Sequence, residues 1–232
     1  MDSIYFKTNE ELDKYLDSHT VKRLGVGKDG RCVLLDNGLV AKKLWQDYYP
    51  DFALQFKDIE VPSFVFARSA AFVGDFVKAV FMEQAKGDTL LERRVDYQRM
   101  DTLGDHLGVL SKDIITLSDM GVLIKDFHCG NIVYDEKRLR IIDTLPFLKL
   151  PNGKYKEENL REVMIRLYEN ILSEIFKYKK VSFRFRYYGH NEFLEDPKYY
   201  LQLLRNYIME LTEEEIVTVE DASMALKKKL KE

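Results

Sequence analysis

The sequence predicts an α+β fold, with strands in the first third of the chain and mostly helices after it. Two apolar runs, CVLL and LVAKKLW, meet at Asp36-Asn37-Gly38, and Asn-Gly is the residue pair that a tight hairpin turn requires. Residues 99–120 carry apolar side chains at three- and four-residue spacing, which is typical of an amphipathic helix packed on a core. These side chains are Met100, Leu103, Leu107, Leu110, Ile114 and Leu117.

Length and composition favour a folded chain with a substantial core, as one domain or as two lobes. The chain has 232 residues, of which 46% are apolar, and only five prolines. Its formal charge of −3 argues against a nucleic-acid binder, since such proteins are normally strongly basic. No apolar run approaches the roughly 20 residues that a membrane span needs.

Residues 1–12 are acidic and lack the basic and apolar regions of a signal peptide. The two cysteines, Cys32 and Cys129, do not suggest a structural disulfide. We therefore expect a reduced, cytoplasmic protein. Thr8-Asn9-Glu10-Glu11 has the pattern of a capping box, so residues 1–18 are predicted to form a helical extension before the main fold.

A glycine-rich loop follows, in which Gly25, Gly27 and Gly30 have the spacing G-x-G-x-x-G. Dinucleotide-binding folds use the same spacing, but there the loop opens a helix. Here it leads into a strand, a turn and another strand. This order favours a loop that covers phosphate groups, and the alternative is an ordinary glycine-rich turn.

The stretch that organises the rest of the chain is 121–144, which contains an apolar strand, a polar loop and a hairpin of the runs IVYD and LRII. Asp126 is followed five residues later by Asn131, and Asp143 comes twelve residues after that. The hairpin fixes the distance between the loop and the end of the second strand. We expect the three side chains to converge, and their oxygens suit Mg²⁺.

The D-x-x-x-x-N loop followed by an aspartate resembles the catalytic core of the protein-kinase-like phosphotransferases. The resemblance is to a small, divergent member of this superfamily, and it implies a bilobal fold. A five-stranded antiparallel N-lobe sheet with one short helix would span 19–85. A mostly helical C-lobe would span 86–232, with the catalytic loop at 124–131.

The resemblance implies a role for each residue of this stretch. Asp126 would orient the acceptor hydroxyl and accept its proton, and Asn131 and Asp143 would hold the Mg²⁺ ions that bridge the ATP phosphates. His128 stands where aminoglycoside-type kinases carry histidine. The loop thus combines features of Ser/Thr protein kinases and of aminoglycoside-type kinases.

The same resemblance places a phosphate-binding lysine on the third strand, where Lys42 and Lys43 are both candidates. Strand alternation points them to opposite faces. Comparison with kinase strands such as V-A-L-K-K-I favours Lys42, on the face of Val40 and Leu44. Aligning Ala41 with the usual alanine would favour Lys43. The lysine that does not bind phosphate would be solvated.

Residues 82–87 resemble a kinase hinge, M-E-x-x-x-G, in which the backbones of Glu83 and Ala85 would bind the adenine edge. The alternative is a strand that ends in a glycine turn. The helix expected over 46–60 contains Pro50, so it must be short. Its acidic residues at workable spacing are Asp47, Asp51, Asp58 and Glu60, and none is a convincing partner for the strand lysine.

These features predict an ATP- and Mg²⁺-dependent kinase that phosphorylates a hydroxyl group of a protein Ser/Thr or of a small molecule. The alternative is a nucleotide-binding pseudokinase that acts as a regulatory or scaffold module. It is supported by the missing helix glutamate and by Ile124, Lys125, Thr144 and Leu145, which replace family motif residues. The basic and aromatic stretch Lys177–His190 could bind single-stranded nucleic acid, but a packed helix connection is the simpler interpretation.

Overall fold

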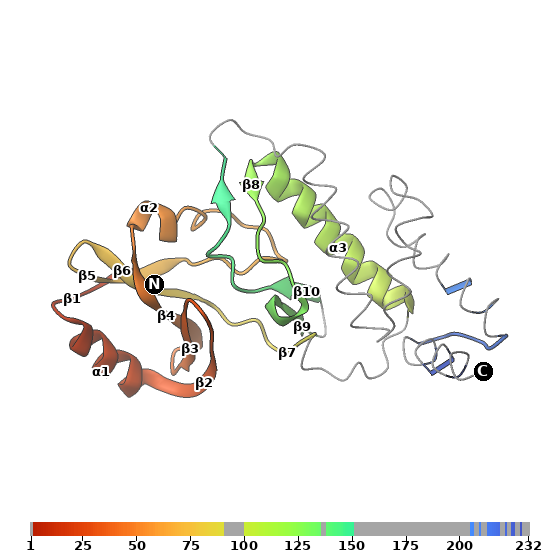
Figure 1. The fold of residues 1–232 in the computed structure, drawn as a ribbon, viewed down its shortest axis with the longest axis horizontal. Helices are drawn as coiled ribbons and strands as arrows, with labels where there is room; N and C mark the ends of the chain where they lie inside the picture. Colours follow the sequence, from red (N-terminus) through yellow and green to blue (C-terminus); the bar gives the residue numbers. More distant parts are fainter. Residues whose placement is uncertain are drawn as a thin grey trace. The chain divides into compact units, whose positions relative to one another are not determined.

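The computed structural model describes residues 2–90, 100–135, 138–150, 205–206, 209, 213–218, 221, 224–225 and 228 (Figure 1). The chain divides into two compact units. The first comprises Met1–Ala85 with Ile142–Leu145, and the second comprises Lys86–Ile141 with Pro146–Glu232. A four-residue segment from the second half of the chain therefore belongs to the first unit.

The first unit is built on a six-stranded mixed sheet with the strand order β1-β5-β6-β4-β3-β2. The strands are β1 (Ile4–Phe6), β2 (Thr20–Val26), β3 (Gly30–Leu35), β4 (Leu39–Tyr48), β5 (Ser69–Val73) and β6 (Phe76–Glu83). Neighbouring strands are antiparallel except β1 and β5, which are parallel. The α+β prediction is confirmed, and the hairpin at Asp36-Asn37-Gly38 joins β3 to β4 as predicted, with Gly38 at a φ of 81°.

The sheet differs from the expected five antiparallel strands in two respects. Residues 4–6, expected within the helical extension, form a sixth strand that pairs with β5. Three residues are too few for an alternating pattern to show, so only the pairing with β5 identifies this strand. The apolar sequence from Pro62 to Phe72 is strand-like throughout, yet β5 begins only at Ser69, although residues 63–67 are buried.

Helical segments pack against both faces of this sheet. Helix α1 (Asn9–His19) is capped as predicted by Thr8, whose Oγ1 accepts a hydrogen bond from the backbone N of Glu11 at 3.3 Å. Its buried Leu12 and Leu16 pack in a cluster with sheet residues. Those sheet residues are Val33, Leu35, Ala41, Ala71, Ala79 and Phe81.

The opposite face packs against the short helix α2 (Pro50–Ala53), which the proline in this region predicted to be short. Ala53 of this helix joins a second apolar cluster with Leu44, Ala67, Ala70, Phe72, Val77 and Val80. Leu145 packs against this cluster from the segment 142–145. Ala41 and Leu44, three positions apart on β4, thus lie on opposite faces of the sheet because side chains alternate along a strand.

The second unit contains the long helix α3 (Met100–Asp119), close to the predicted bounds of 99–120. Leu107, Leu110, Ile114 and Leu117 are fully buried, as their spacing predicted. The predicted hairpin is also present, with Asp135 opposite Arg138. Its strands are β9 (Ile132–Asp135) and β10 (Arg138–Ile141), and the remaining short strands are β7 (Asp88–Thr89), β8 (Val122–Leu123) and β11 (Leu148–Lys149).

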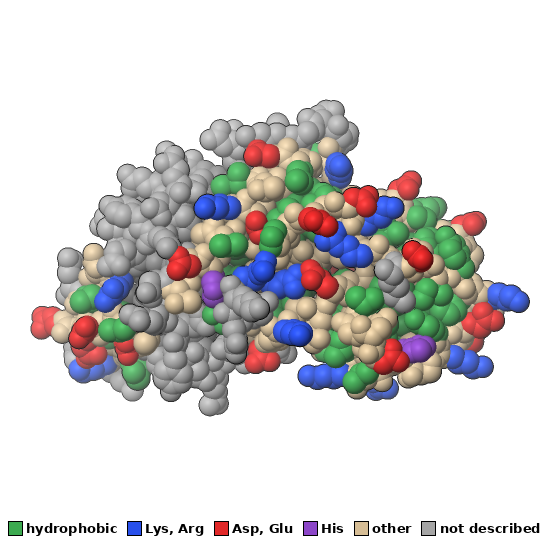
Figure 2. All heavy atoms as spheres, turned by 180° about the vertical axis from the view of Figure 1, so that it is seen from behind, with side chains coloured by type: hydrophobic (Ala, Val, Ile, Leu, Met, Phe, Trp, Pro, Cys, Tyr) green, Lys and Arg blue, Asp and Glu red, His purple; other side chains and the backbone are tan. Residues whose placement is uncertain are grey.

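The helices predicted after 151 and the stretch Lys177–His190 lie outside the described residues. In the part that is described, no helix combines the length and the apolar character needed to cross a membrane. Acidic and basic side chains both occur across the face seen in Figure 2, among apolar ones, in keeping with the small net charge.

Candidate functional site

Strand β4 directs its two adjacent lysines to opposite faces of the sheet, and each meets an aspartate there. Lys42 is buried, and its Nζ lies 2.6 Å from Oδ1 of Asp143. Lys43 points toward α1, where its Nζ lies 2.5 Å from Oδ1 of Asp13. The expectation that the second lysine would be solvated is therefore wrong, because Lys43 ties α1 to the sheet.

Asp143 reaches Lys42 from the segment that follows β10 and belongs to the first unit. Its φ is 59°, in the left-handed region that non-glycine residues seldom adopt, although aspartate tolerates it better than most. Such backbone conformations persist where the surrounding contacts hold them. Here the ion pair with Lys42 is one of those contacts.

Two weak acids close to this ion pair have pKa values above their ordinary values. Burial raises the pKa of the Cys32 thiol, Lys42 lowers it and Asp143 raises it further. Cys32 lies directly opposite Lys42 in the β3–β4 register. Burial also raises the pKa of the Tyr48 phenol, to which Asp29 and Asp143 contribute in the same direction. The surroundings of Lys42 therefore disfavour additional negative charge on these groups.

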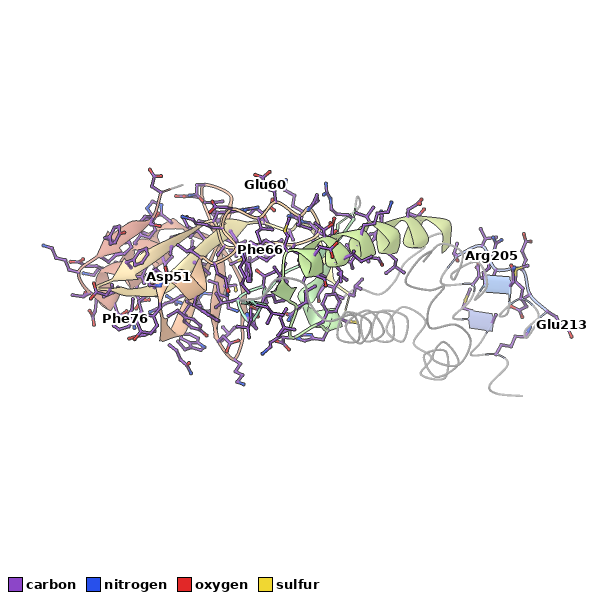
Figure 3. All side chains as sticks on the ribbon, turned by 90° about the horizontal axis from the view of Figure 1, so that it is seen from above. Asp51, Glu60, Phe66, Phe76, Arg205 and Glu213 are labelled. Carbon is purple, nitrogen blue, oxygen red and sulfur yellow. The ribbon has the colours of Figure 1, made fainter. Side chains whose placement is uncertain are left out.

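The carboxylates that were considered as helix partners for the strand lysine do not provide the ion-pair partner of Lys42. Helix α2 has only four residues, and Asp51, Asp58 and Glu60 are all exposed. Figure 3 shows Glu60 at the edge of the molecule. The ion-pair partner of Lys42 in the described residues is Asp143, which is 101 residues away in sequence.

The glycine-rich loop forms a tight turn between β2 and β3. The backbone N of Gly27 donates to the carbonyl of Gly30 at 2.8 Å. Trp45 on β4 holds the turn twice: its Nε1 donates to the carbonyl of Gly27 at 3.2 Å, and its backbone N donates to the carbonyl of Asp29 at 3.1 Å. No role for Trp45 was predicted from the sequence. The one feature of the sequence that could have pointed to it is its position on the same strand as Lys42, three residues later.

The three glycines of this loop differ in what requires them. A Cβ at Gly30 would collide with the backbone carbonyl of Lys43, so the β3–β4 pairing itself demands glycine there. At Gly25 no heavy atom lies within 4 Å of an added Cβ, and at Gly27 the nearest is 3.9 Å away. Packing within the described residues therefore does not explain why glycine stands at positions 25 and 27.

The predicted hinge follows directly from the sheet. Glu83 is the last residue of β6 and lies opposite Leu39 of β4, with its side chain exposed. Ala85 comes two residues later, outside the strand, and is the last residue of this part of the first unit. Strand β6 therefore ends within the expected hinge.

The polar loop of the second unit is organised by hydrogen bonds among its own residues. Asp126 has a φ of 54°, and its backbone carbonyl accepts a hydrogen bond from Nδ2 of Asn131 at 3.0 Å. The 3₁₀ turn η1 (Cys129–Asn131) brings Asn131 back to Asp126, with the Cys129 side chain buried beneath it. Oδ1 is the Asn131 atom able to coordinate a cation, because the amide nitrogen Nδ2 is a donor only.

His128 of the same loop faces the Asp126 carboxylate, with Nε2 3.8 Å from Oδ1. Its Nδ1 accepts a hydrogen bond from the backbone N of Gly130 at 3.1 Å, so a neutral ring carries its proton on Nε2. Both side chains are about half exposed, at 52% and 54%. The loop thus presents an accessible carboxylate with an imidazole beside it.

The sequence-predicted residues are divided between the two units. Asp126, His128 and Asn131 come together in the second unit, and Lys42, Asp143, the three glycines, Glu83 and Ala85 belong to the first. Within the described residues, no group of three or more His, Cys, Asp or Glu side chains could hold a metal ion. No protein-family model matches the chain, and no curated protein matches it either.

Proposed function

We propose that this chain is an ATP- and Mg²⁺-dependent kinase that transfers the γ-phosphoryl group to a hydroxyl acceptor. The observation that carries the proposal is the ion pair between Lys42 and Asp143, 2.6 Å apart. The resemblance assigns these residues from two separate motifs, a strand lysine and an aspartate after a hairpin. Their direct contact within one unit is what a shared role at the phosphates of a nucleotide requires.

Phosphoryl transfer asks a protein mainly for positioning and for neutralisation of charge. In the proposed reaction Lys42 binds the α- and β-phosphates, and the open backbone of Gly25 and Gly27 lies against phosphate oxygens. Asp143 and Asn131 provide oxygen donors of the kind that Mg²⁺ prefers. The Mg²⁺ ion, when bound, neutralises charge that develops on the transferred group.

Asp126 is the proposed base, which orients the acceptor hydroxyl and takes its proton as the phosphoryl group moves to the oxygen. Its half-exposed carboxylate can reach an acceptor, and Asn131 holds its backbone. The acceptor is a protein Ser/Thr or a small molecule. His128 beside Asp126 favours a small-molecule acceptor, whereas the M-E hinge favours a protein.

The test is transfer of label from γ-labelled ATP with Mg²⁺ to pooled proteins and to pooled alcohols and sugars, comparing wild type with Asp126→Asn. The substitution keeps the side-chain shape and a residue that tolerates positive φ, so the loop should keep its form. We expect transfer to fall by about 10²- to 10⁴-fold. Asp51→Asn, at an exposed residue of α2, is the control and should transfer normally.

The pseudokinase alternative is favoured by one observation, the absence of a helix carboxylate beside Lys42 in the described residues. Both hypotheses predict nucleotide binding, and only the kinase predicts transfer. Trp45, the single tryptophan, is hydrogen-bonded to the glycine turn, so its fluorescence can report binding. Binding without transfer to any acceptor would favour the pseudokinase, and no binding would reject both.

A further inference from the structure

Thr144, the residue after Asp143, forms a buried hydrogen bond within the first unit. Its side chain is buried, with a relative exposure of 6%. Its Oγ1 donates to the backbone carbonyl of Val65 at 2.8 Å. In the kinase-like motif this position is occupied by phenylalanine, which has no hydroxyl group and could not make this hydrogen bond.

The acceptor of this bond lies in a buried stretch that has no continuous strand pairing. Residues 63–67 are buried and precede β5, so their backbone carbonyls depend on individual partners. A buried carbonyl without a partner is costly, and Thr144 supplies the partner for Val65. This hydrogen bond therefore ties Thr144 to the buried stretch that precedes β5.

The neighbours of Thr144 are docked on the same unit by different forces. On one side Asp143 forms the ion pair with Lys42. On the other side Leu145 packs against the apolar cluster around Leu44 and Val80. Three consecutive side chains therefore attach this segment to the rest of the first unit by charge, by a hydrogen bond and by apolar packing.

We propose that Thr144 is a positioning residue, whose hydrogen bond to Val65 keeps Asp143 in its left-handed conformation and directs the carboxylate at Lys42. The bond acts on the backbone one residue from the φ of 59°. Without it, that torsion is free to relax and the carboxylate to turn away. The positioning role itself does not depend on the proposed function. Its expected consequence, a higher affinity for Mg²⁺, rests on the proposed function.

The first test needs neither nucleotide nor metal. Thr144→Val keeps the shape and removes the donor, and Thr144→Ser keeps the donor. The amines are labelled with a lysine acylating reagent, and the rates at Lys42 and Lys43 are read by peptide mass spectrometry. We expect the Lys42 rate to rise severalfold in Thr144→Val and to stay at the wild-type value in Thr144→Ser.

Lys43 is the internal control, since it pairs with Asp13 on the other face and its rate should not change. An unchanged Lys42 rate in Thr144→Val would overturn the proposal. An equal rise at both lysines would also overturn it, because that result means general loosening of the unit. If Thr144→Val does not fold, Thr144→Ala gives the same readout.

The second test measures the Mg²⁺ dependence of phosphoryl transfer. Loss of one hydrogen bond predicts an increase of about five- to tenfold in the Mg²⁺ concentration for half-maximal rate in Thr144→Val, with kcat at saturating Mg²⁺ preserved. Thr144→Ser should remain within about twofold of wild type. A changed kcat with unchanged Mg²⁺ dependence contradicts positioning through Asp143. If wild type transfers no phosphate, the proposed function fails while the lysine labelling still decides the role of Thr144.

Discussion

Two aspartates stand out at the scale of single residues. Three non-glycine residues in the described part of the chain have positive φ, and they are Asp126, Asp143 and Glu213. The resemblance to protein-kinase-like phosphotransferases implies the roles of base and metal ligand for the first two of these residues. Unusual backbone conformations concentrate at functional sites, so the positive φ values of Asp126 and Asp143 support the proposal that these two residues act in the reaction.

The adjacent lysines of β4 make a matched pair of variants, Lys42→Met and Lys43→Met. We expect Lys42→Met to weaken ATP binding by at least about tenfold, because it removes the cation proposed to contact the phosphates. Lys43→Met should leave ATP binding within about twofold and lower the free energy of unfolding by about 1 kcal/mol, because it breaks the pair with Asp13.

Trp45 fluorescence measures the first quantity, and urea unfolding measures the second. The two variants control for each other, since they remove the same group from the same strand on opposite faces. The reverse ranking in ATP affinity would assign the phosphate-binding role to Lys43. It would also require Asp13 to release that lysine.

At the scale of elements, β4 connects the parts of the first unit. It contributes Lys42 to one face and Lys43 to the other, and Trp45 holds the glycine turn at its side. Helix α1 is held to the sheet by apolar packing and by charge, since Asp13 also pairs with Arg31 of β3 at 2.9 Å. This helix, expected in the extension before the main fold, thus contributes Leu12 and Leu16 to the core of the first unit.

The glycine turn gives a prediction about three single substitutions. Gly25→Ala and Gly27→Ala should fold with near wild-type stability, because space for a Cβ is open. Both should weaken ATP binding if the backbone lies against phosphates. Gly30→Ala should lower the free energy of unfolding by more than about 1 kcal/mol, because its Cβ meets the Lys43 carbonyl.

Urea unfolding and ATP titration of the same three proteins separate these effects. Gly30→Ala is the control for a purely structural loss at this turn. If Gly25→Ala and Gly27→Ala bind ATP as tightly as wild type, the loop is an ordinary glycine turn. The proposed contact of its backbone with phosphate would then be wrong.

At the scale of the whole molecule, alkaline pH should destabilise the fold. Burial raises the pKa values of the Cys32 thiol and of the Tyr15 and Tyr48 phenols, whose ordinary values are 9.0 and 10.0. The unfolded chain therefore releases these protons at a lower pH than the folded chain does. The stabilisation is fully present below pH 9 and is lost as the pH rises through the folded pKa values.

Urea unfolding between about pH 7 and pH 10.5 tests this prediction, with a free energy of unfolding that declines above about pH 9. Cys32→Ala should flatten the first part of the decline, since it removes the group with the lowest ordinary pKa. An equally steep decline in Cys32→Ala would mean that the thiol titrates alike in both states. The decline would then belong to the tyrosines and other groups.

Local patterns in the sequence by themselves determined several helices and hairpins of this protein. Apolar spacing predicted α3, the capping pattern predicted the start of α1 at Thr8, and the Asn-Gly pair predicted the β3–β4 hairpin. Each of these features depends on residues within a few positions of one another. The runs IVYD and LRII predicted the second hairpin for the same reason.

Only the tertiary structure decided which residues far apart in the sequence pair with each other. Strand β1 is identified only by its pairing with the parallel strand β5. Lys43 of β4 pairs with Asp13 of α1, which is thirty residues earlier in the sequence. Lys42 pairs with Asp143, which is 101 residues away in the sequence. Thr144 donates to the carbonyl of Val65, which is 79 residues away. A sequence fixes which groups are available to pair, but such contacts depend on how the whole chain packs, because no local spacing encodes a distance between segments so far apart.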